Sequence, residues 1–276
     1  MKTVAAMHDL SCYAKSSLTV VIPTLSMMGI EVSPLPTALL STQTDGFPHF
    51  YYKDLNTELT SIVDHWKSLD LHFDAIYSGF IGNDVSVATL IDFVNWQKKY
   101  NPLVIVDPVM GDFGSLYNPI TPHLVKHMKQ LVEIADVVTP NITEAALILD
   151  EEYDANLSVE TASLWARRIA EKGPAYVVIT SVMEKNNSLV VSYDACLNKL
   201  SHFSQLHIPV SYPGCGDLFS SILTGRLLQG VDFSASVADA AYLVKKAVEY
   251  SHEKGFPVRH GVSPESIGYE LVMRYR

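Results

Sequence analysis

The chain has 276 residues, of which 48% are hydrophobic and only 18% are charged, so it has ample material for a large core. Its formal net charge of -10, with no run of lysine and arginine, argues against a nucleic-acid or anionic-membrane partner. No stretch approaches the roughly 18 apolar residues of a membrane span, and the three cysteines form no CxxC pair, so we expect a cytoplasmic protein with reduced thiols.

Strand and helix patterns alternate along the first hundred residues. Apolar runs predict strands at 4–7 and 74–78, and helical spacing predicts helices at 16–29, 56–69 and 83–100. Gly29 is a stop signal for the first of these helices, and Asn83 is a cap for the third.

Three further apolar runs, at 103–106, 135–138 and 176–179, stop at polar residues that precede a turn and a helix. These stops are Asp107-Pro108, Thr139-Pro140 and Thr180-Ser181. Buried parallel strands have this pattern, and ligands of open α/β sheets bind beyond the carboxyl ends of the strands. The polar stops are therefore expected to line a ligand-binding crevice.

The last third of the chain predicts two antiparallel strands, at 188–193 and 206–210, and two helices, at 218–229 and 235–253. No linker, repeat or low-complexity tract interrupts the alternation. The pattern predicts one α/β domain over residues 1–276, with a central, mostly parallel sheet and helices on both faces.

The strongest local motif is Gly214-Cys215-Gly216-Asp217 at the start of a predicted helix. Two glycines let the backbone turn sharply and approach a ligand, while the first amides of the helix point outward as anion donors. Taken alone, the motif is more often a tight turn with Asp217 as a helix cap.

Two further segments carry carboxylates. Asp107 and Asp112 lie five residues apart around a glycine-containing loop, which suits a hard cation such as Mg²⁺ but also an ordinary Asp-Pro turn. Asn141 and Glu144 follow Pro140 with the spacing of a capping box. Their functional alternative is contact with a metal–phosphate group.

Taken together, these motifs resemble the ribokinase superfamily, within it the pyridoxal kinase and hydroxymethylpyrimidine kinase branch. The resemblance runs from His8 to about Gly230. It is carried by 8–11, 40–44, 77–80, 107–112, Tyr117, 139–141 with Glu144, 173–174, 178–181 and 214–217.

The resemblance implies a kinase that phosphorylates the hydroxymethyl group of a B6 vitamer with ATP, and the family is usually homodimeric. Asp217 is the implied general base, and the amides of Gly214, Cys215 and Gly216 the implied anion hole. The resemblance also implies Mg²⁺ at Asp112 and Glu144, and a monovalent cation such as K⁺ at Asp107, Thr139 and Thr180. Nucleotide phosphates would contact Asn141, Thr180 and Ser181. The substrate ring would contact Asp9 or Ser11, Thr44 and Tyr77.

One residue departs from the resemblance, because Cys215 stands where such families commonly have a small hydroxyl residue or alanine. Amides at a helix start lower a thiol pKa, so one hypothesis is that Cys215 adds reversibly to the aldehyde of pyridoxal, and the alternative is that the thiol only replaces a hydroxyl of similar size. Residues 113–117 are a candidate active-site flap.

Two alternatives stay open at this point. The substrate could be hydroxymethylpyrimidine or its phosphate, because pyridine and pyrimidine alcohols have similar size and polarity. The chain could also be a catalytically silent binder of a B6 vitamer. The histidines, among them His8, His123 and His127, show no recognised metal-ligand spacing and are expected to be without chemistry.

Overall fold

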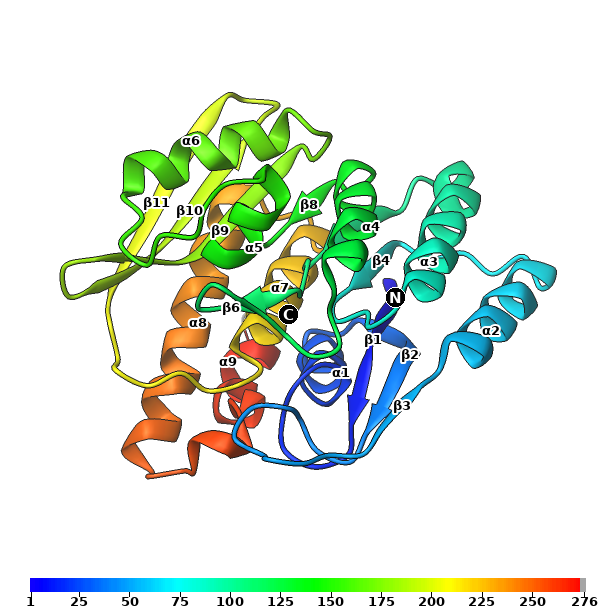
Figure 1. The fold of residues 1–276 in the computed structure, drawn as a ribbon, viewed down its shortest axis with the longest axis horizontal. Coiled ribbons are helices and arrows are strands. Elements are labelled where there is room, and N and C mark those ends of the chain that lie inside the picture. Colours follow the sequence, from blue (N-terminus) through cyan, green and yellow to red (C-terminus); the bar gives the residue numbers. More distant parts are fainter. Residues whose placement is uncertain (274–276) are drawn as a thin grey trace.

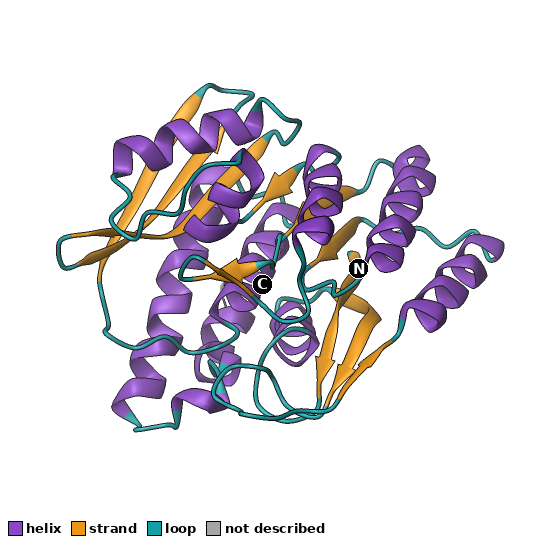
Figure 2. Ribbon diagram, in the orientation of Figure 1, coloured by secondary structure: helices purple, strands orange, loops and turns teal. Residues whose placement is uncertain are grey.

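The computed structural model describes residues 1–273, and one nine-stranded sheet runs through them (Figures 1 and 2). The strand order is β11-β10-β9-β8-β5-β4-β1-β2-β3. The six strands from β9 to β2 are parallel, whereas β3 at one edge and β10 and β11 at the other are antiparallel. The strands are β1 (Thr3–Ser11), β2 (Glu31–Leu40), β3 (Tyr52–Asp54), β4 (Ala75–Ser78), β5 (Leu103–Val106), β8 (Val137–Val138), β9 (Tyr176–Glu184), β10 (Asn187–Asp194) and β11 (Lys199–Leu206).

Helices cover both faces of the sheet. The helices are α1 (Leu18–Met27), α2 (Asn56–Ser68), α3 (Asp84–Gln97), α4 (Pro122–Glu133), α5 (Ile142–Leu149), α6 (Val159–Ala170), α7 (Cys215–Leu228), α8 (Phe233–Glu253) and α9 (Gly268–Met273), with 3-10 turns η1 (Lys98–Tyr100), η2 (Val258–His260) and η3 (Pro264–Ile267). One face carries α2 to α6, and the other carries α1, α7, α8 and α9 (Figure 1).

The core is divided by the sheet into two apolar layers. In β1, Ala5 and Met7 belong to the layer beneath α2 to α6, whereas Val4 and Ala6 belong to the opposite layer. All four are fully buried, because side chains alternate between the faces of a strand and both faces are covered. The expected mostly parallel α/β fold is confirmed. Within residues 1–273, no helix is long and apolar enough to cross a bilayer.

Local signals placed several elements correctly. The strand predicted at 103–106 is β5, and the predicted cap Asn83 accepts a hydrogen bond from the Ser86 N–H at 2.8 Å. The helix predicted at 16–29 is α1, which ends at Met27. The strand predicted at 188–193 is β10.

Two expectations about strands were wrong, and one strand was missed. In the run predicted at 206–210, only Leu206 is in a strand, because it ends β11, whose alternating exposure hides it from a search for apolar runs. The strand predicted to stop at Ile179 continues to Glu184. Strand β2 was missed because it contains Pro34 and Pro36, which are unusual in strands. The sheet tolerates both prolines because β3 pairs only with residues 38–40, so residues 31–37 lie at the sheet edge.

Candidate active site

Four parallel strands deliver polar residues to one edge of the sheet. β1 carries Asp9 near its carboxyl end, β4 carries Tyr77, and β5 and β8 are followed by Asp107 and Thr139. Because parallel strands share one carboxyl edge, these residues meet where α7 begins. The polar residues that were expected to line a crevice therefore lie together, while the crevice itself stays a prediction.

Asp217 is held by the backbone of a distant segment and does not cap α7. The N-cap of α7 is Gly214, so Asp217 is the third helical residue, and its Oδ2 accepts a hydrogen bond from the Ser17 N–H at 2.7 Å. Burial raises the pKa of Asp217 to about 8, and the negative charges of Asp107 and Asp9 act in the same direction. The side chain still keeps 12% exposure, so a ligand can reach it.

The turn before α7 requires glycine. Gly214 has φ +82°, and a Cβ there would lie 2.8 Å from the carbonyl oxygen of Lys15. Because the N-cap is glycine, no capping side chain accepts a hydrogen bond from the first amides of α7. Uncapped amides are what the expected anion-binding role of 214–216 requires, and that role stays a prediction.

A neutral histidine lies beside Asp217. His8 Nδ1 is 3.7 Å from Asp217 Oδ1, and burial lowers the pKa of His8 to about 3, so the contact is not an ion pair. Neither ring nitrogen of His8 has a hydrogen-bond partner among the described residues. The ring meets Tyr77 edge-on, with 4.4 Å between the ring centroids.

Ser17 connects two buried carboxyls. Its N–H binds Asp217, while its hydroxyl donates to Asp9, which also accepts a hydrogen bond from Ser11 Oγ at 3.0 Å. Burial raises the pKa of Asp9, and the two hydroxyl donors oppose that shift. Ser17 has φ +51°, in the left-handed region, so the segment between β1 and α1 is bent to make these contacts. Nothing in the local sequence identified Ser17.

A third buried carboxyl, Asp107, is held by two hydroxyls. Thr139 Oγ1 donates to its Oδ1 at 3.1 Å and Ser220 Oγ to its Oδ2 at 3.4 Å. Burial raises the pKa of Asp107. A methyl group at Gly216 would lie 3.6 Å from its Oδ2, which places Asp107 beside the start of α7. Thr139 therefore joins Asp107 as expected, and Ser220 is an additional partner.

Asn141 and Glu144 form the capping box that their spacing predicted. The Asn141 side chain accepts from the Glu144 N–H at 2.9 Å, and Glu144 Oε2 accepts from the Asn141 N–H at 2.8 Å. The same two side chains hold the neighbouring loop, through the N–H of Met110 and the carbonyl of Gly111. Glu144 is buried, and its pKa is raised by burial and by Asp107.

Several carboxyls gather in this region. Burial is the largest cause of the raised pKa of Asp107, Asp112 and Glu144, and within residues 1–273 no lysine or arginine lowers the pKa of any of the three. The Tyr117 pKa is also raised, first by burial and then by nearby carboxylates including Asp112 and Glu144. Such a concentration of oxygen ligands fits a hard divalent cation.

The candidate flap is a short hairpin. Its strands are β6 (Gly111–Asp112) and β7 (Ser115–Leu116), joined by Phe113 and Gly114, both with positive φ. Phe113 at its tip is 74% exposed, and the Gly114 N–H donates to Thr143 Oγ1 at 3.0 Å.

Thr180 and Ser181 lie in a β-bulge and not at a strand end. Between Ile179 and Val182, β9 has one residue more than β10 opposite, and Ser181 adopts φ +63°. Thr180 forms an isolated bridge with Asn141, and its N–H donates to the Pro140 carbonyl at 3.0 Å. The structure thus brings two of the three expected nucleotide contacts together, with exposed Ser181 adjacent.

One of the expected substrate contacts needs revision. Tyr77 is fully buried, with its hydroxyl 3.4 Å from the Asp217 carbonyl, so it supports α7 from the core. Thr44 is exposed in the segment between β2 and β3, and its contact with the substrate ring stays a prediction.

The expectation of a reactive Cys215 was wrong about charge. Burial raises the pKa of the Cys215 thiol to about 12, and Asp217 acts in the same direction. The helix-start amides do not outweigh the loss of solvation, so the thiol stays protonated.

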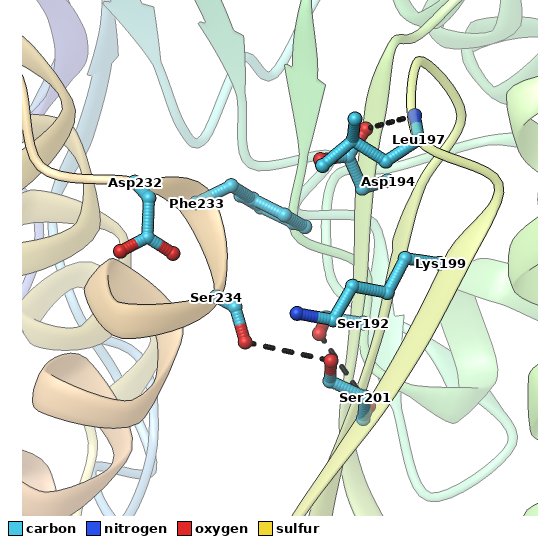
Figure 3. Close-up of a pocket in the computed structure, with 8 residues that line it drawn as sticks. All are labelled: Ser192, Asp194, Leu197, Lys199, Ser201, Asp232, Phe233 and Ser234. Carbon is cyan, nitrogen blue, oxygen red and sulfur yellow. Dashed lines mark hydrogen bonds between the residues drawn. The ribbon is translucent and has the colours of Figure 1, made fainter.

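A small cavity of about 50 Å³ lies away from these residues (Figure 3). Its walls are β10, β11 and the start of α8, where Ser234 Oγ donates to Ser201 Oγ at 3.4 Å. None of the candidate site residues lines it.

Comparison with known proteins identifies the class. Residues 22–265 match the family model described as phosphomethylpyrimidine kinase, and the chain belongs to this family of phosphotransferases. It is 31% identical over 248 residues to the pyridoxal kinase PdxY of Photobacterium profundum, covering 83% of this chain and 81% of that protein.

Solved structures agree with this assignment. A Bacteroides thetaiotaomicron protein described as a phosphomethylpyrimidine kinase, in a crystal form with pyridoxal, is 38% identical with TM-score 0.94, covering 98% of this chain and 95% of that one. The pyridoxal kinase of Lactobacillus plantarum is 28% identical with TM-score 0.92, covering 99% and 98% of the two chains. The resemblance to the ribokinase-like pyridoxal and phosphomethylpyrimidine kinase branch is confirmed.

Proposed function

We propose that this kinase transfers the γ-phosphoryl group of ATP to the hydroxymethyl oxygen of pyridoxal. The observation that carries the proposal is the position of Asp217. It is a nearly buried carboxyl with a pKa of about 8, in the first turn of a helix whose leading amides are not capped. The pyridoxal-containing relative supports the choice of substrate.

Asp217 acts as the general base in this proposal. A base is most effective when the pKa of its conjugate acid approaches that of the working solution, and burial moves Asp217 into that range. As the substrate oxygen bonds to the γ-phosphorus, its proton passes to the Asp217 carboxylate, and the bond to the leaving ADP breaks. The Ser17 N–H fixes the carboxylate and leaves Oδ1 for the substrate.

The amides of 214–216 stabilise the transferring phosphoryl group. They belong to the turn and first residues of α7, where backbone N–H groups have no partner within the helix. Helix-start amides bind phosphate oxygens through hydrogen bonds and through the helix dipole. Because Gly214 and Gly216 have no side chains, the phosphate can approach the backbone closely.

Buried carboxyls hold the cations. Asp112 and Glu144 would hold Mg²⁺, and Asp107, Thr139 and Thr180 would hold a monovalent cation such as K⁺. Each Glu144 oxygen accepts one amide N–H and keeps a second lone pair, which suits contact through a water molecule. Mg²⁺ supplies neutralisation of the phosphate charge when it is bound.

Nucleotide phosphates fit the opposite side of the site. Asn141 and Thr180 lie together across the isolated bridge, and Ser181 follows in the bulge. Asp9 or Ser11 would contact the substrate ring from the end of β1.

A turnover screen tests the function. Pyridoxal, pyridoxine, pyridoxamine and hydroxymethylpyrimidine would each be incubated with magnesium ATP, and ADP release and the phosphorylated product would be measured. We expect ATP-dependent conversion of pyridoxal to pyridoxal 5'-phosphate. Binding of pyridoxal without turnover of any of the four would instead support a non-catalytic binder.

A second substrate class is favoured by the family model, whose description is phosphomethylpyrimidine kinase. Hydroxymethylpyrimidine and its phosphate carry a primary alcohol or phosphate on a ring similar in size to pyridine. A kcat/KM for hydroxymethylpyrimidine above that for pyridoxal would reverse the preferred assignment.

We also propose a cytoplasmic homodimer in which residues 1–276 form one kinase domain. The continuous nine-stranded sheet supports the single domain, and the free thiols Cys12, Cys196 and Cys215 suit a reducing compartment. Sedimentation of the purified protein would test the dimer.

A further inference from the structure

A cluster of two histidines and one aspartate lies outside the kinase site. Asp84 is the first residue of α3, while His123 and His127 lie one turn apart in the first half of α4. Residues four apart on a helix point to the same side. The sequence showed no recognised metal motif at these histidines, and the structure adds Asp84 to them from another helix.

The candidate ligand atoms lie close to one another. His123 Nε2 lies 3.2 Å from Asp84 Oδ2, and His127 Nδ1 lies 3.1 Å from Asp84 Oδ1. One ligand atom from each residue can be chosen so that all three lie within 4.8 Å of one another. In tetrahedral zinc sites with bonds of about 2.0–2.2 Å, neighbouring ligand atoms are separated by about 3.3–3.6 Å.

The cluster is open on its outer side. The side chains of Asp84, His123 and His127 keep 42%, 69% and 32% exposure. Small adjustments of these exposed rings would bring both imidazoles to a shared ion, while water could complete the coordination. The two rings already meet edge-on with 4.7 Å between centroids.

We propose that Asp84, His123 and His127 form a binding site for a divalent first-row transition-metal ion, with Zn²⁺ as its representative. Two imidazole nitrogens and one carboxylate oxygen suit zinc, cobalt, nickel or copper, whereas Mg²⁺ prefers oxygen ligands alone. The site is therefore chemically distinct from the carboxylate-rich region around Asp112 and Glu144.

A bound ion would connect α3 to α4, which follows the candidate flap in the chain. α3 begins just after β4, and α4 begins just after the segment that contains the β6–β7 hairpin. An ion that binds only the folded chain raises its stability with the logarithm of the free ion concentration, once that concentration exceeds the dissociation constant. The proposed site therefore links metal binding to the packing of α3 against α4.

Cobalt absorption and zinc competition test the site in the full chain. Chelator-treated protein would be titrated with Co²⁺, whose visible absorption reports nitrogen and oxygen coordination, and then with Zn²⁺ against a chromophoric chelator. We expect one Co²⁺ per chain, displaced by Zn²⁺ but not by Mg²⁺. His127→Ala should weaken Zn²⁺ binding by at least about tenfold.

Controls separate this site from other zinc ligands. His65→Ala removes an exposed helical histidine on α2 and should leave Zn²⁺ affinity unchanged. His123→Ala repeats the test should His127→Ala fold poorly by circular dichroism. Unchanged Zn²⁺ affinity in a folded His123→Ala or His127→Ala variant would overturn the proposal, as would Zn²⁺ binding that depends on Cys12 or Cys196 instead.

Discussion

The candidate site has a base half around Asp217 and a nucleotide half around Thr180, and the two differ in how deeply their polar groups are buried. The base half places Asp9 and Asp217 between β1 and α7, where burial raises both pKa values. The nucleotide half places Thr180 and Ser181 in a bulge of β9, where hydroxyls and backbone remain partly or fully exposed. A proton-accepting group gains basicity from burial, whereas a phosphate contact needs access more than a shifted pKa.

The base half therefore carries a folding cost that the nucleotide half does not. A buried carboxyl is unfavourable unless its charge is compensated, and Asp107 adds to the negative charge around Asp217 and Asp9. In the proposed function, cations and the phosphoryl group complete the set of interactions. The following experiments test this difference, from the largest expected effect to the smallest.

Removal of the Asp217 carboxylate should have the largest effect. Asp217→Asn keeps an oxygen for the Ser17 N–H but removes the proton acceptor, so kcat should fall by ~10²–10⁴ with a modest change in the KM for ATP. Steady-state kinetics with pyridoxal and ATP would measure it.

The matched control is Asp232→Asn, because Asp232 is a helix cap of α8 whose side chain accepts the Ala235 N–H. It should leave kcat unchanged, since asparagine also caps helices. Near parental turnover in Asp217→Asn would mean that this carboxylate serves structure and not chemistry.

His8, which lies beside Asp217, can be displaced by a substitution at Gly79. A Cβ at Gly79 would lie 2.2 Å from His8 Nδ1, and the His8 ring cannot move into solvent because it is fully buried. Gly79→Ala should lower the free energy of unfolding by about 1–3 kcal/mol and lower kcat more than it raises the KM for ATP. Urea unfolding and kinetics would be measured together.

Gly268→Ala serves as its control. A Cβ there meets only the Met27 sulfur, at 3.0 Å, which a flexible side chain can relieve. If Gly79→Ala changed the KM for ATP while kcat stayed constant, His8 would belong functionally to the nucleotide half.

The sequence predicted the local parts of both halves. The capping box of Asn141 and Glu144 depends on four consecutive residues, and β5 is bounded by residues that end it directly. Contacts that join distant segments were not predictable, because no local pattern encodes them. Ser17 lies 200 residues from Asp217, and Ser220 lies 113 residues from Asp107.

Tyr77 and Cys215 show a second limit of the sequence. Both stand in motifs that suggest ligand contact, yet burial decides their chemistry. Tyr77 has no exposure, and the Cys215 pKa rises to about 12. The bulge at Thr180 and Ser181 was hidden for a related reason, since only the pairing with β10 reveals the extra residue.

The folding cost of the base half should appear as a pH dependence of stability. The Asp217 pKa rises from its ordinary value of 3.8 to about 8 on folding, so the folded chain binds the proton more tightly than the unfolded chain. The contribution of Asp217 to stability is then greatest at low pH, and it is lost as the pH rises through the folded pKa of about 8. Between about pH 6 and 9, the titration of Asp217 should remove about 2–3 kcal/mol of unfolding free energy from the ligand-free protein.

Asp217→Asn should flatten this dependence, because the amide does not titrate. Urea unfolding at several pH values would compare the two proteins, without ATP or divalent cation. Equal slopes would show that Asp217 has an ordinary pKa in the folded chain, and the proposed contrast between the halves would lose its electrostatic basis.

The smallest effect is expected at Cys215, which lies in the base half but carries no charge there. A thiol with a pKa of about 12 stays protonated near neutral pH, so it is a poor nucleophile toward the aldehyde of pyridoxal. Cys215→Ser keeps the helix-start amides and nearly keeps the volume. Turnover of pyridoxal and of pyridoxine, which lacks the aldehyde, should therefore change by the same small factor, at most about threefold. A loss confined to pyridoxal would show that the thiol does react with the aldehyde, and that a bound substrate changes its ionisation.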